Sequence, residues 1–362
     1  MATVNEGCDK KLEISLCMIV RDEEDVLERC LLSVCDVVDE IIIVDTGSID
    51  RTTEIAKKFT DNLFHYEWAD DFAAARNYSF SLATKEYIMW LDADDVLEDK
   101  ESFLTLKKQL DGTINRVSMP YHLSFNENGQ VTHSLKRNRI VKNDARFQWS
   151  GKVHEFLIVY GEALESDIPI LHKKIKPHSS RNLKIYLKMI ESKIPFTHRD
   201  TFYFANELMY NGRTEEAIKY YESFLLEKGG WIEDNITACL HLSHCYKELD
   251  QERRLHYLFQ TFEYDTPRAE ACCEIARYFI EQSQLPLAIF WLELIFSLKK
   301  PKTMGFVNES SWTYVPHIEL CYCYDQLGQL DKSYAHHIKA REIAPDHPSV
   351  LFNEEYFKKR LD

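Results

Sequence analysis

Long apolar runs are missing from this sequence. No apolar stretch approaches the roughly 20 residues that a helix needs to cross a bilayer. The N-terminus, which reads MATVNEG, also lacks the basic region and apolar core of a secretory signal peptide. We therefore expect a cytoplasmic protein that has no membrane span.

Basic charge is scarce as well. The 362 residues include 44 lysines and arginines against 59 aspartates and glutamates, which gives a formal net charge of −15. The basic residues form no cluster that could neutralise successive phosphates along a nucleic-acid backbone. The composition therefore argues against DNA or RNA as a partner.

The cysteines show no pattern of pairing. There are ten of them, but no two are arranged as C-x-x-C, the spacing typical of zinc sites and redox motifs. Nine of the ten lie in apolar segments. We expect reduced thiols that pack as small hydrophobic side chains, rather than disulfides or a structural zinc site.

The glycine-rich nucleotide motifs are absent too. The sequence contains neither the G-x-G-x-x-G fingerprint of dinucleotide-binding folds nor the G-x-x-x-x-G-K-[ST] loop of many ATPases. These absences argue against an NAD-dependent enzyme and against a P-loop ATPase. A nucleotide bound here would instead contact acidic side chains through its base and ribose, and a metal ion and an arginine through its phosphates.

The first half does contain a regular alternation of strand and helix patterns. Short apolar runs rich in β-formers predict strands at residues 13–20, 40–45, 63–68 and 87–91. Segments with helical spacing separate these runs, and Asp22 is a candidate N-cap for the first helix. This order predicts a doubly wound α/β domain. Acidic residues follow the predicted strand ends at Asp45, Asp70, Asp71, Asp92 and Asp94.

The last predicted strand ends in a set of carboxylates. Residues 87–95 read YIMWLDADD, an apolar run followed by Asp92, Asp94 and Asp95. If the chain stays extended, Asp92 and Asp94 point the same way, because only Ala93 separates them. Two oxygen ligands at the carboxyl edge of a sheet suit Mg²⁺ or Mn²⁺ carrying the phosphates of a ligand. For an isolated D-x-D, the alternative is an acidic turn without a ligand.

Four motifs in this half resemble family 2 glycosyltransferases with the GT-A fold. They read SLCMIVRDEEDVLERCLLSV, DEIIIVDTGSIDRT, WADDFAAARN and WLDADD, and they follow the family's order across roughly residues 13–175. The resemblance implies a divalent ion held by Asp92 and Asp94, a UDP-hexose donor, and a contact from Asp45 to uracil or ribose. The residues that it places at the nucleotide-sugar are Val20, Arg21, Glu23, Asp45, Gly47, Ser48, Arg76, Asp92, Ala93 and Asp94.

A further motif, FQWSGKVHE at residues 147–155, resembles the group of family 2 enzymes that includes the sublancin S-glycosyltransferase. Glu155 is our candidate for the general base that removes the acceptor's proton, with a surface glutamate capping a helix as the alternative. His154 is a candidate to orient the acceptor or to act as the base, and Trp149 to form an apolar wall beside the sugar or acceptor. The resemblance implies that His172 is a third metal ligand, with a structural histidine as the alternative.

The second half is helical and repetitive. A polar, proline-containing segment predicts a linker or lid at residues 176–197. Beyond it, four helical patterns are aligned on residues spaced by 38, 33 and 45 positions, namely Ala217, Leu255, Ala288 and Ser333. They resemble about four degenerate tetratricopeptide repeats, whose period is about 34 residues. Stacked repeats leave a groove suited to an extended peptide or a second subunit.

Together these features predict a GT-A domain over residues 1–175 and a tetratricopeptide-like domain over residues 198–362. We expect metal-dependent, inverting transfer of a hexose from UDP-hexose to a Cys, Ser or Thr of a peptide or protein bound by the repeats. One alternative is an acceptor on a cell-surface polysaccharide or lipid-linked glycan. Another is a scaffold whose repeats function and whose transferase domain is inactive. A homodimer is one further assembly that such repeats allow, because repeat domains often pair.

Overall fold

The computed structural model describes residues 12–126, 129–175 and 179–361. The chain forms two compact units, one of Met1–His122 with Lys136–Ser179 and the other of Leu123–Leu135 with Ser180–Asp362. The chain therefore passes between the units three times. The tip of one strand hairpin belongs to the second unit, which the single boundary at residue 175 did not anticipate.

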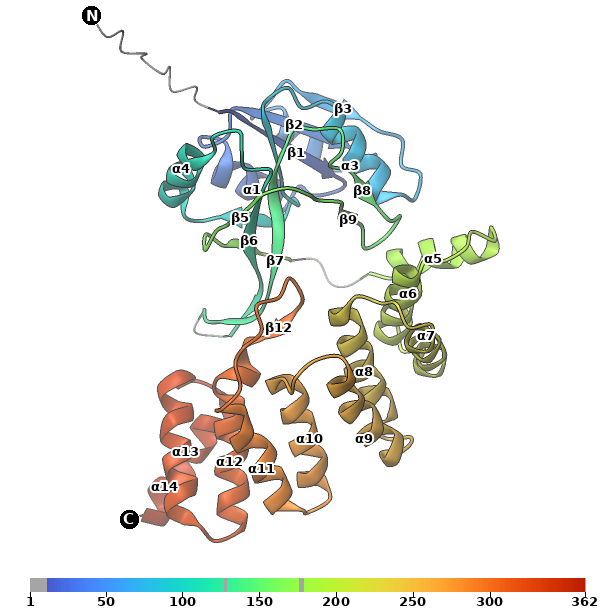
Figure 1. The fold of residues 1–362 in the computed structure, drawn as a ribbon. Coiled ribbons are helices and arrows are strands. Elements are labelled where there is room, and N and C mark those ends of the chain that lie inside the picture. The colour runs from blue at the N-terminus through green and yellow to red at the C-terminus, as the bar shows by residue number, and fades with distance from the viewer. Residues whose placement is uncertain (1–11, 127–128, 176–178, 362) are drawn as a thin grey trace, which may run out of the picture. The chain divides into compact units, whose positions relative to one another are not determined.

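A mixed β-sheet forms the centre of the first unit (Figure 1). Its strands follow the order β3-β2-β1-β4-β7-β6-β11-β5, and β10 pairs with β6 beside this path. β1 pairs in parallel with β2 and β4, and β2 with β3, whereas β7 joins β4 antiparallel. The bounds are β1 Ile14–Val20, β2 Glu40–Asp45, β3 Leu63–His65, β4 Tyr87–Trp90, β5 Asp95–Leu97, β6 Arg116–Phe125, β7 Val131–Lys142, β10 Ala163–Glu165 and β11 Ile170–His172. The expected α/β class is confirmed.

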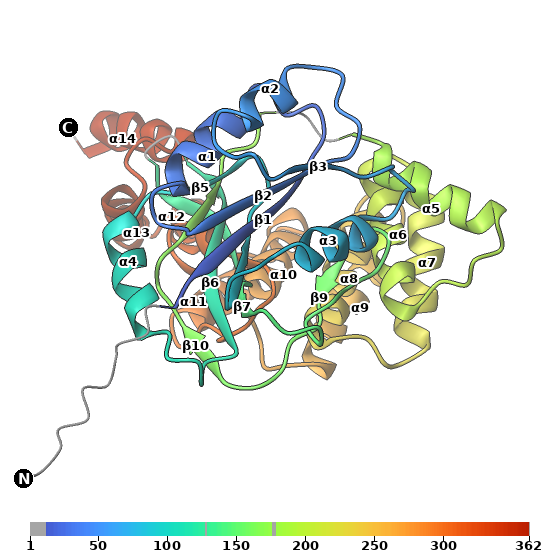
Figure 2. The ribbon, with the colours of Figure 1, turned by 90° about the horizontal axis from the view of Figure 1, so that it is seen from above.

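Helices cover both faces of the parallel part of this sheet. α1 (Leu27–Val34) and α2 (Thr52–Ala56) lie on one side of β1 and β2, and α3 (Phe72–Ser81) lies on the other (Figure 2). Right-handed crossovers require this arrangement, because the chain moves outward from β1 to β3 and then returns to β4 on the opposite side of β1. The fourth helix, α4 (Lys100–Gln109), follows β5.

Burial on both faces explains the nearly continuous apolar composition of the central strands. One core cluster joins β1, β2, β4 and α3 to the segment after β7, and its buried members are Cys17, Ile42, Val44, Ala73, Phe80, Ile88, Trp90, Val141, Phe147 and Trp149. The nine cysteines of the described residues are free thiols, as expected, and Cys8 lies outside those residues.

Asp22 does not cap the first helix, so that prediction was wrong. The N-cap of α1 is Val26. Asp22 instead adopts a left-handed backbone conformation with φ of 54°, and its Oδ1 accepts a hydrogen bond of 2.8 Å from the Ile49 amide. A turn intervenes between the strand and the helix, and this turn uses the carboxylate to hold the neighbouring loop.

The second unit is built from pairs of helices. The pairs are α6 (His198–Tyr210) with α7 (Thr214–Leu226), α8 (Ile232–Tyr246) with α9 (Gln251–Gln260), α10 (Ala269–Glu281) with α11 (Leu285–Ile295), and α12 (Val315–Gln326) with α13 (Leu330–Ile343). α14 (Pro348–Leu361) follows the last pair. Each expected repeat begins at the turn inside one pair, so four tetratricopeptide-like repeats are confirmed.

One position in the expected alignment of these repeats is shifted by a residue. Ala217, Ala288 and Ser333 each occupy the fourth residue of the second helix in their pair and are fully buried. In α9 that place belongs to Arg254, which is 2% exposed, rather than to Leu255. The arginine is tolerated because its guanidinium forms an ion pair with Glu281 at the end of α10.

A helix stands in part of the segment that we expected to be a linker. α5 spans Arg181–Glu191, and residues 176–178 lie outside the described part of the chain. Among the described helices, none combines the length and the apolar character that crossing a membrane requires.

The buried alanine of the third repeat offers a test of this packing. Ala288→Leu adds three heavy atoms where α11 packs against α10 and α12, and overpacking of this kind costs about 1–3 kcal/mol. Urea unfolding followed by far-UV circular dichroism should show a destabilised helical transition. The matched control is Ala335→Leu, at an exposed position of α13, which should leave the transition within about 0.5 kcal/mol of the wild type.

Candidate active site

The loops that follow β1 and β2 are tied together at the carboxyl edge of the sheet. The Thr46 amide donates to the Val20 carbonyl at 2.9 Å, and the Asp22 amide donates to the Ser48 hydroxyl at 3.0 Å. The Glu23 amide donates to the Thr52 hydroxyl at 2.7 Å. These bonds bring the predicted nucleotide-binding residues at positions 20–23 and 45–48 into one place.

Asp45 uses its carboxylate to close the turn that follows β2. Its Oδ2 accepts from the Gly47 amide and its Oδ1 from the Ser48 amide, each at 3.1 Å. The turn requires φ of 103° at Gly47, a conformation that glycine adopts without steric cost. Asp45 is only 7% exposed, and its carboxylate already accepts these internal bonds. Little of the carboxylate is therefore open to a base or ribose.

The acidic stretch after β4 is a turn rather than an extended segment. The Asp95 amide donates to the Asp92 carbonyl at 3.0 Å, and the Asp92 amide donates to Asp95 Oδ2 at 2.9 Å. The two-residue spacing of Asp92 and Asp94 therefore does not place them on one side of a strand. The Asp94 carbonyl accepts from the Lys173 amide at 2.9 Å, so the turn is also joined to the end of β11.

Asp94 and His172 lie close together, as expected, but their third neighbour is Asp95. Ligand atoms of Asp94, Asp95 and His172 all lie within 4.8 Å of one another, and this is the group suited to a metal ion among the described residues. His172 Nδ1 is 3.4 Å from Asp94 Oδ1. Asp92, which we expected to share the ion with Asp94, is outside this group because the turn directs its carboxylate elsewhere.

Arg76 joins two carboxylates from distant parts of the chain. Its Nη2 lies 2.6 Å from Asp92 Oδ1, and its Nε lies 2.7 Å from Glu155 Oε1. The arginine is 8% exposed, and its guanidinium lies over the rings of Trp90 and Trp149 at 5.1 and 4.8 Å from their centroids. We call this arrangement of Asp92, Arg76 and Glu155 the Arg76 bridge.

Helix α3 also fixes the segment that carries Glu155. That segment is a small hairpin of β8 (Trp149–Ser150) and β9 (Phe156–Leu157). Asn77 holds the backbone of Trp149 by two hydrogen bonds of 2.8 and 2.9 Å. The Phe72 amide donates to the Lys152 carbonyl at 2.9 Å. The side-by-side Arg76 and Asn77 of the WADDFAAARN motif therefore hold the bridge and the hairpin together.

Trp149 does not form the apolar wall that we expected. It is 5% exposed and packs edge-on against Trp90, with ring centroids 4.8 Å apart. Its ring packs against the guanidinium of Arg76, so Trp149 is a buried core residue beside the site. His154 lies in the hairpin turn with φ of 50°, immediately before Glu155.

Burial and charge act against each other on the ionisable groups of the site. Burial would raise the pKa of Asp92, but the positive charges of Arg76 and Arg139 outweigh it and lower the pKa to about 2. Burial opposes protonation of His172, yet hydrogen bonds to Asp94 and Asp95 outweigh it and raise the pKa of His172 to about 9. Asp92 is therefore ionised near neutral pH, and the metal-free site holds a protonated imidazole at His172.

The residues present fit a divalent cation. Asp94 and His172 have partly exposed side chains, at 23% and 21%. Mg²⁺ takes one or two protein carboxylates and completes its shell with water and phosphate oxygens, and Mn²⁺ also accepts imidazole. Three buried residues, Asp95, Tyr121 and Arg139, surround this pair. The sequence pattern includes Asp95 in the acidic run without giving it a role, and it does not single out Tyr121 or Arg139. For Arg139, the available signal was its place within the sequence KRNRIVK at residues 136–142, which forms the end of β7.

The mixed α/β sheet of the first unit is consistent with the GT-A fold. Residues 15–160 match the model of Glycosyl transferase family 2. The chain therefore contains a family 2 glycosyltransferase domain, followed by tetratricopeptide-like repeats.

The relatives include a protein named for TPR repeats and a protein named as a glycosyltransferase. The chain is 46% identical over 144 residues to a TPR repeat-containing protein of Synechococcus elongatus, covering 38% of this chain and 34% of that protein. It is 30% identical over 219 residues to the glycosyltransferase SunS of Bacillus subtilis, covering 56% of this chain and 51% of SunS. Among solved structures, the TPR protein YrrB matches 48% of this chain and 82% of its own length, at 17% identity and a TM-score of 0.36. The chain thus spans between a third and about half the length of these curated relatives.

The raised pKa of His172 predicts how stability depends on pH. The pKa of His172 is about 9 when folded and 6.5 when unfolded, so its ion pairs stabilise the metal-free protein fully below pH 6.5, and this contribution is lost as pH rises through 9. We expect a loss of about 2 kcal/mol over that range, allowing for partial exposure. His172→Gln should remove the dependence, and His256→Gln, at an exposed position of α9, should retain it. Thermal unfolding in EDTA between pH 6 and 9.5 measures both; parallel curves for wild type and His172→Gln would contradict the assignment.

Proposed function

We propose that the protein is a metal-dependent, inverting glycosyltransferase that moves a hexose from UDP-hexose to a peptide or protein. The observation that carries this proposal is the position of the Asp94–His172 pair beside the Arg76 bridge, at the carboxyl edge of the sheet in a family 2 domain. Ligands of open α/β sheets bind at this edge. The relative SunS, itself described as a glycosyltransferase, supports the reaction class.

The donor is held by the loops after β1, β2 and β4. Asp94 and His172 would hold Mg²⁺ or Mn²⁺ against the diphosphate, and the bound ion supplies Lewis-acid stabilisation of the negative charge on the leaving nucleoside diphosphate. Arg76 keeps Asp92 ionised at the rim of the same turn. Asp45 stays near the base and ribose, because its own turn fixes the carboxylate.

Glu155 acts on the acceptor. Arg76 binds its Oε1, so the second oxygen, Oε2, is not committed to that ion pair. The acceptor oxygen or sulfur forms a bond to the anomeric carbon while the bond from that carbon to the diphosphate breaks on the opposite face. The acceptor's proton passes to Glu155. A cysteine acceptor needs less help from a base, because part of a thiol is already ionised near neutral pH.

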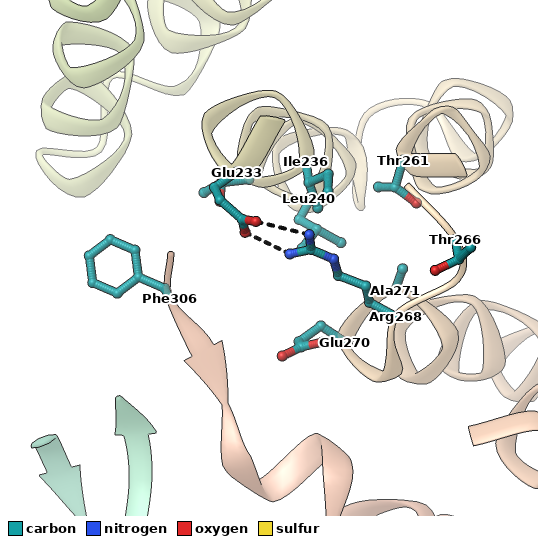
Figure 3. A pocket seen from close by; sticks show the side chains of 10 residues that line it. Glu233, Ile236, Leu240, Thr261, Thr266, Arg268, Glu270, Ala271 and Phe306 are labelled. Carbon is teal, nitrogen blue, oxygen red and sulfur yellow. Dashed lines mark hydrogen bonds and ion pairs between the residues drawn. The ribbon is translucent and has the colours of Figure 1, made fainter. Parts of the chain in front are cut away.

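The helical repeats recruit the acceptor. A small pocket lies between α8 and α10 (Figure 3). Ile236, Leu240 and the exposed ring of Phe306 give it an apolar side, and Glu233 and Arg268 form a two-bond ion pair of 2.6 and 2.9 Å within it. Stacked repeats present such surfaces to extended peptides. This surface favours a peptide over a polysaccharide or lipid-linked glycan as acceptor.

One experiment decides between the proposed function and its alternatives. The protein is incubated with Mn²⁺, a panel of UDP- and GDP-sugars and peptides from a cell extract, and both peptide mass and released nucleotide are measured. We expect a hexose-sized mass gain with matching release of UDP, and Asp94→Asn should abolish both. Donor hydrolysis without a labelled peptide would indicate that the acceptor is a glycan. If the protein neither binds nor hydrolyses any donor, the repeats would be its functional part.

The base assignment has its own test. Glu155→Gln should lower turnover by about 100-fold or more with a hydroxyl acceptor, because it removes proton transfer while the amide can still bind Arg76. The affinity for UDP, measured by calorimetry, should stay within about twofold. His154→Asn is the comparison. If that variant shows the larger loss of turnover and Glu155→Gln remains active, then His154 is the base.

A further inference from the structure

We propose that Arg139 is a positioning residue for the metal site: through Asp95 and Tyr121 it fixes the directions of Asp94 and His172. This inference rests on the proposed metal-dependent function. Arg139 lies on β7 and is 0% exposed, so it touches neither the donor nor the acceptor. Its effect on the site must pass through the residues that it contacts.

Aromatic rings fix the orientation of the Arg139 guanidinium. The group lies over the rings of Trp90 and Tyr121, at 4.0 and 4.3 Å from their centroids. A planar guanidinium stacked on two rings keeps its hydrogen-bond donors in one plane. Its Nη1 lies 3.0 Å from Asp95 Oδ2 and 3.4 Å from the Trp90 carbonyl. The donor that reaches Asp95 is therefore held in a fixed direction.

Asp95 connects the Arg139 guanidinium to the backbone of the acidic turn at residues 92–95. It is 0% exposed, and its Oδ2 forms an ion pair with Arg139 and accepts a hydrogen bond from the Asp92 amide. Its Oδ1 accepts from the Tyr121 hydroxyl at 2.8 Å. A carboxylate so surrounded by donors has little capacity left for a cation. Asp95 has a carboxylate oxygen within 4.8 Å of the ligand atoms of Asp94 and His172. Its role is nevertheless to close the turn that carries Asp94.

Tyr121 carries the same constraint to His172. Its oxygen lies 2.7 Å from His172 Nδ1. Because Tyr121 gives its proton to the Asp95 carboxylate, its lone pairs face the Nδ1 edge of the imidazole. This contact holds the ring with Nδ1 directed at the acidic turn, 3.4 Å from Asp94 Oδ1. Partners of this kind orient metal-binding histidines in proteins generally.

Arg139 contributes little to the free energy of unfolding, so we infer that its charge serves the function of the site. Its Nε and Nη2 are buried and have no hydrogen-bond partner among the described residues. A buried ion pair gains little net stability, because desolvation of both charges offsets their attraction, and buried donors without partners add a further cost. An apolar side chain of similar length would fill this space at lower cost. The charge is therefore needed for the group that it orients.

The test is the affinity of the donor-free protein for Mn²⁺, measured by electron paramagnetic resonance. Arg139→Met should weaken Mn²⁺ binding by about 10–100-fold, as loss of such supporting groups does elsewhere. Thermal unfolding should show that the variant remains folded. The matched control is Arg146→Met, which removes an exposed arginine paired with Asp144 and should bind Mn²⁺ like the wild type. A purely structural role for Arg139 would change the melting temperature but not the affinity of the folded protein.

A second variant covers the case in which Arg139→Met fails to fold. Tyr121→Phe removes only the hydroxyl between Asp95 and His172, and we expect it to weaken Mn²⁺ binding at least tenfold. Folded Arg139→Met that binds Mn²⁺ within threefold of the wild type would overturn the inference alone. So would an unchanged affinity in Tyr121→Phe if Arg139→Met does not fold. A wild-type protein without affinity for Mn²⁺ would overturn both the metal-dependent function and this inference.

Discussion

The Arg76 bridge is the interaction on which the site depends. One buried guanidinium, supported by two tryptophan rings, holds the acid that begins the turn after β4 and the acid of the β8–β9 hairpin. Burying Arg76 without both partners would leave an uncompensated charge, which costs several kcal/mol. The turn after β4 and the β8–β9 hairpin are thus set relative to each other by one side chain of α3.

The general fold followed from the sequence because its determinants are local. Apolar runs of strand length, separated by helical spacing, specify a doubly wound sheet whatever their detailed contacts. The site was only partly accessible in this way. The pairing of Asp94 with His172 came from the family resemblance, but the turn at residues 92–95 depends on bonds to Asp95 and Lys173 that spacing does not encode.

The misplaced residues share one physical cause. Leu255 was preferred to Arg254 for a buried position, and Arg139 was not considered at all, because charged side chains are rarely buried. Each arginine is nevertheless buried beside a carboxylate that follows it or precedes it by tens of residues, Glu281 and Asp95. Such pairs become visible only when the fold brings distant segments together. A sequence pattern based on hydrophobicity assigns them to the surface.

The hairpin of β6 and β7 limits which repeat domains can be fused to the first domain. Its tip, residues 123–135, belongs to the helical unit, where Ser134 and His133 pair with β12 (Val307–Asn308). A gene fusion that joined the first 175 residues to a foreign repeat array would lose this strand partner and expose an unpaired backbone edge, which invites aggregation. We therefore expect the hairpin of β6 and β7 and the segment between α11 and α12 that carries β12 to occur together, although they are far apart in the sequence.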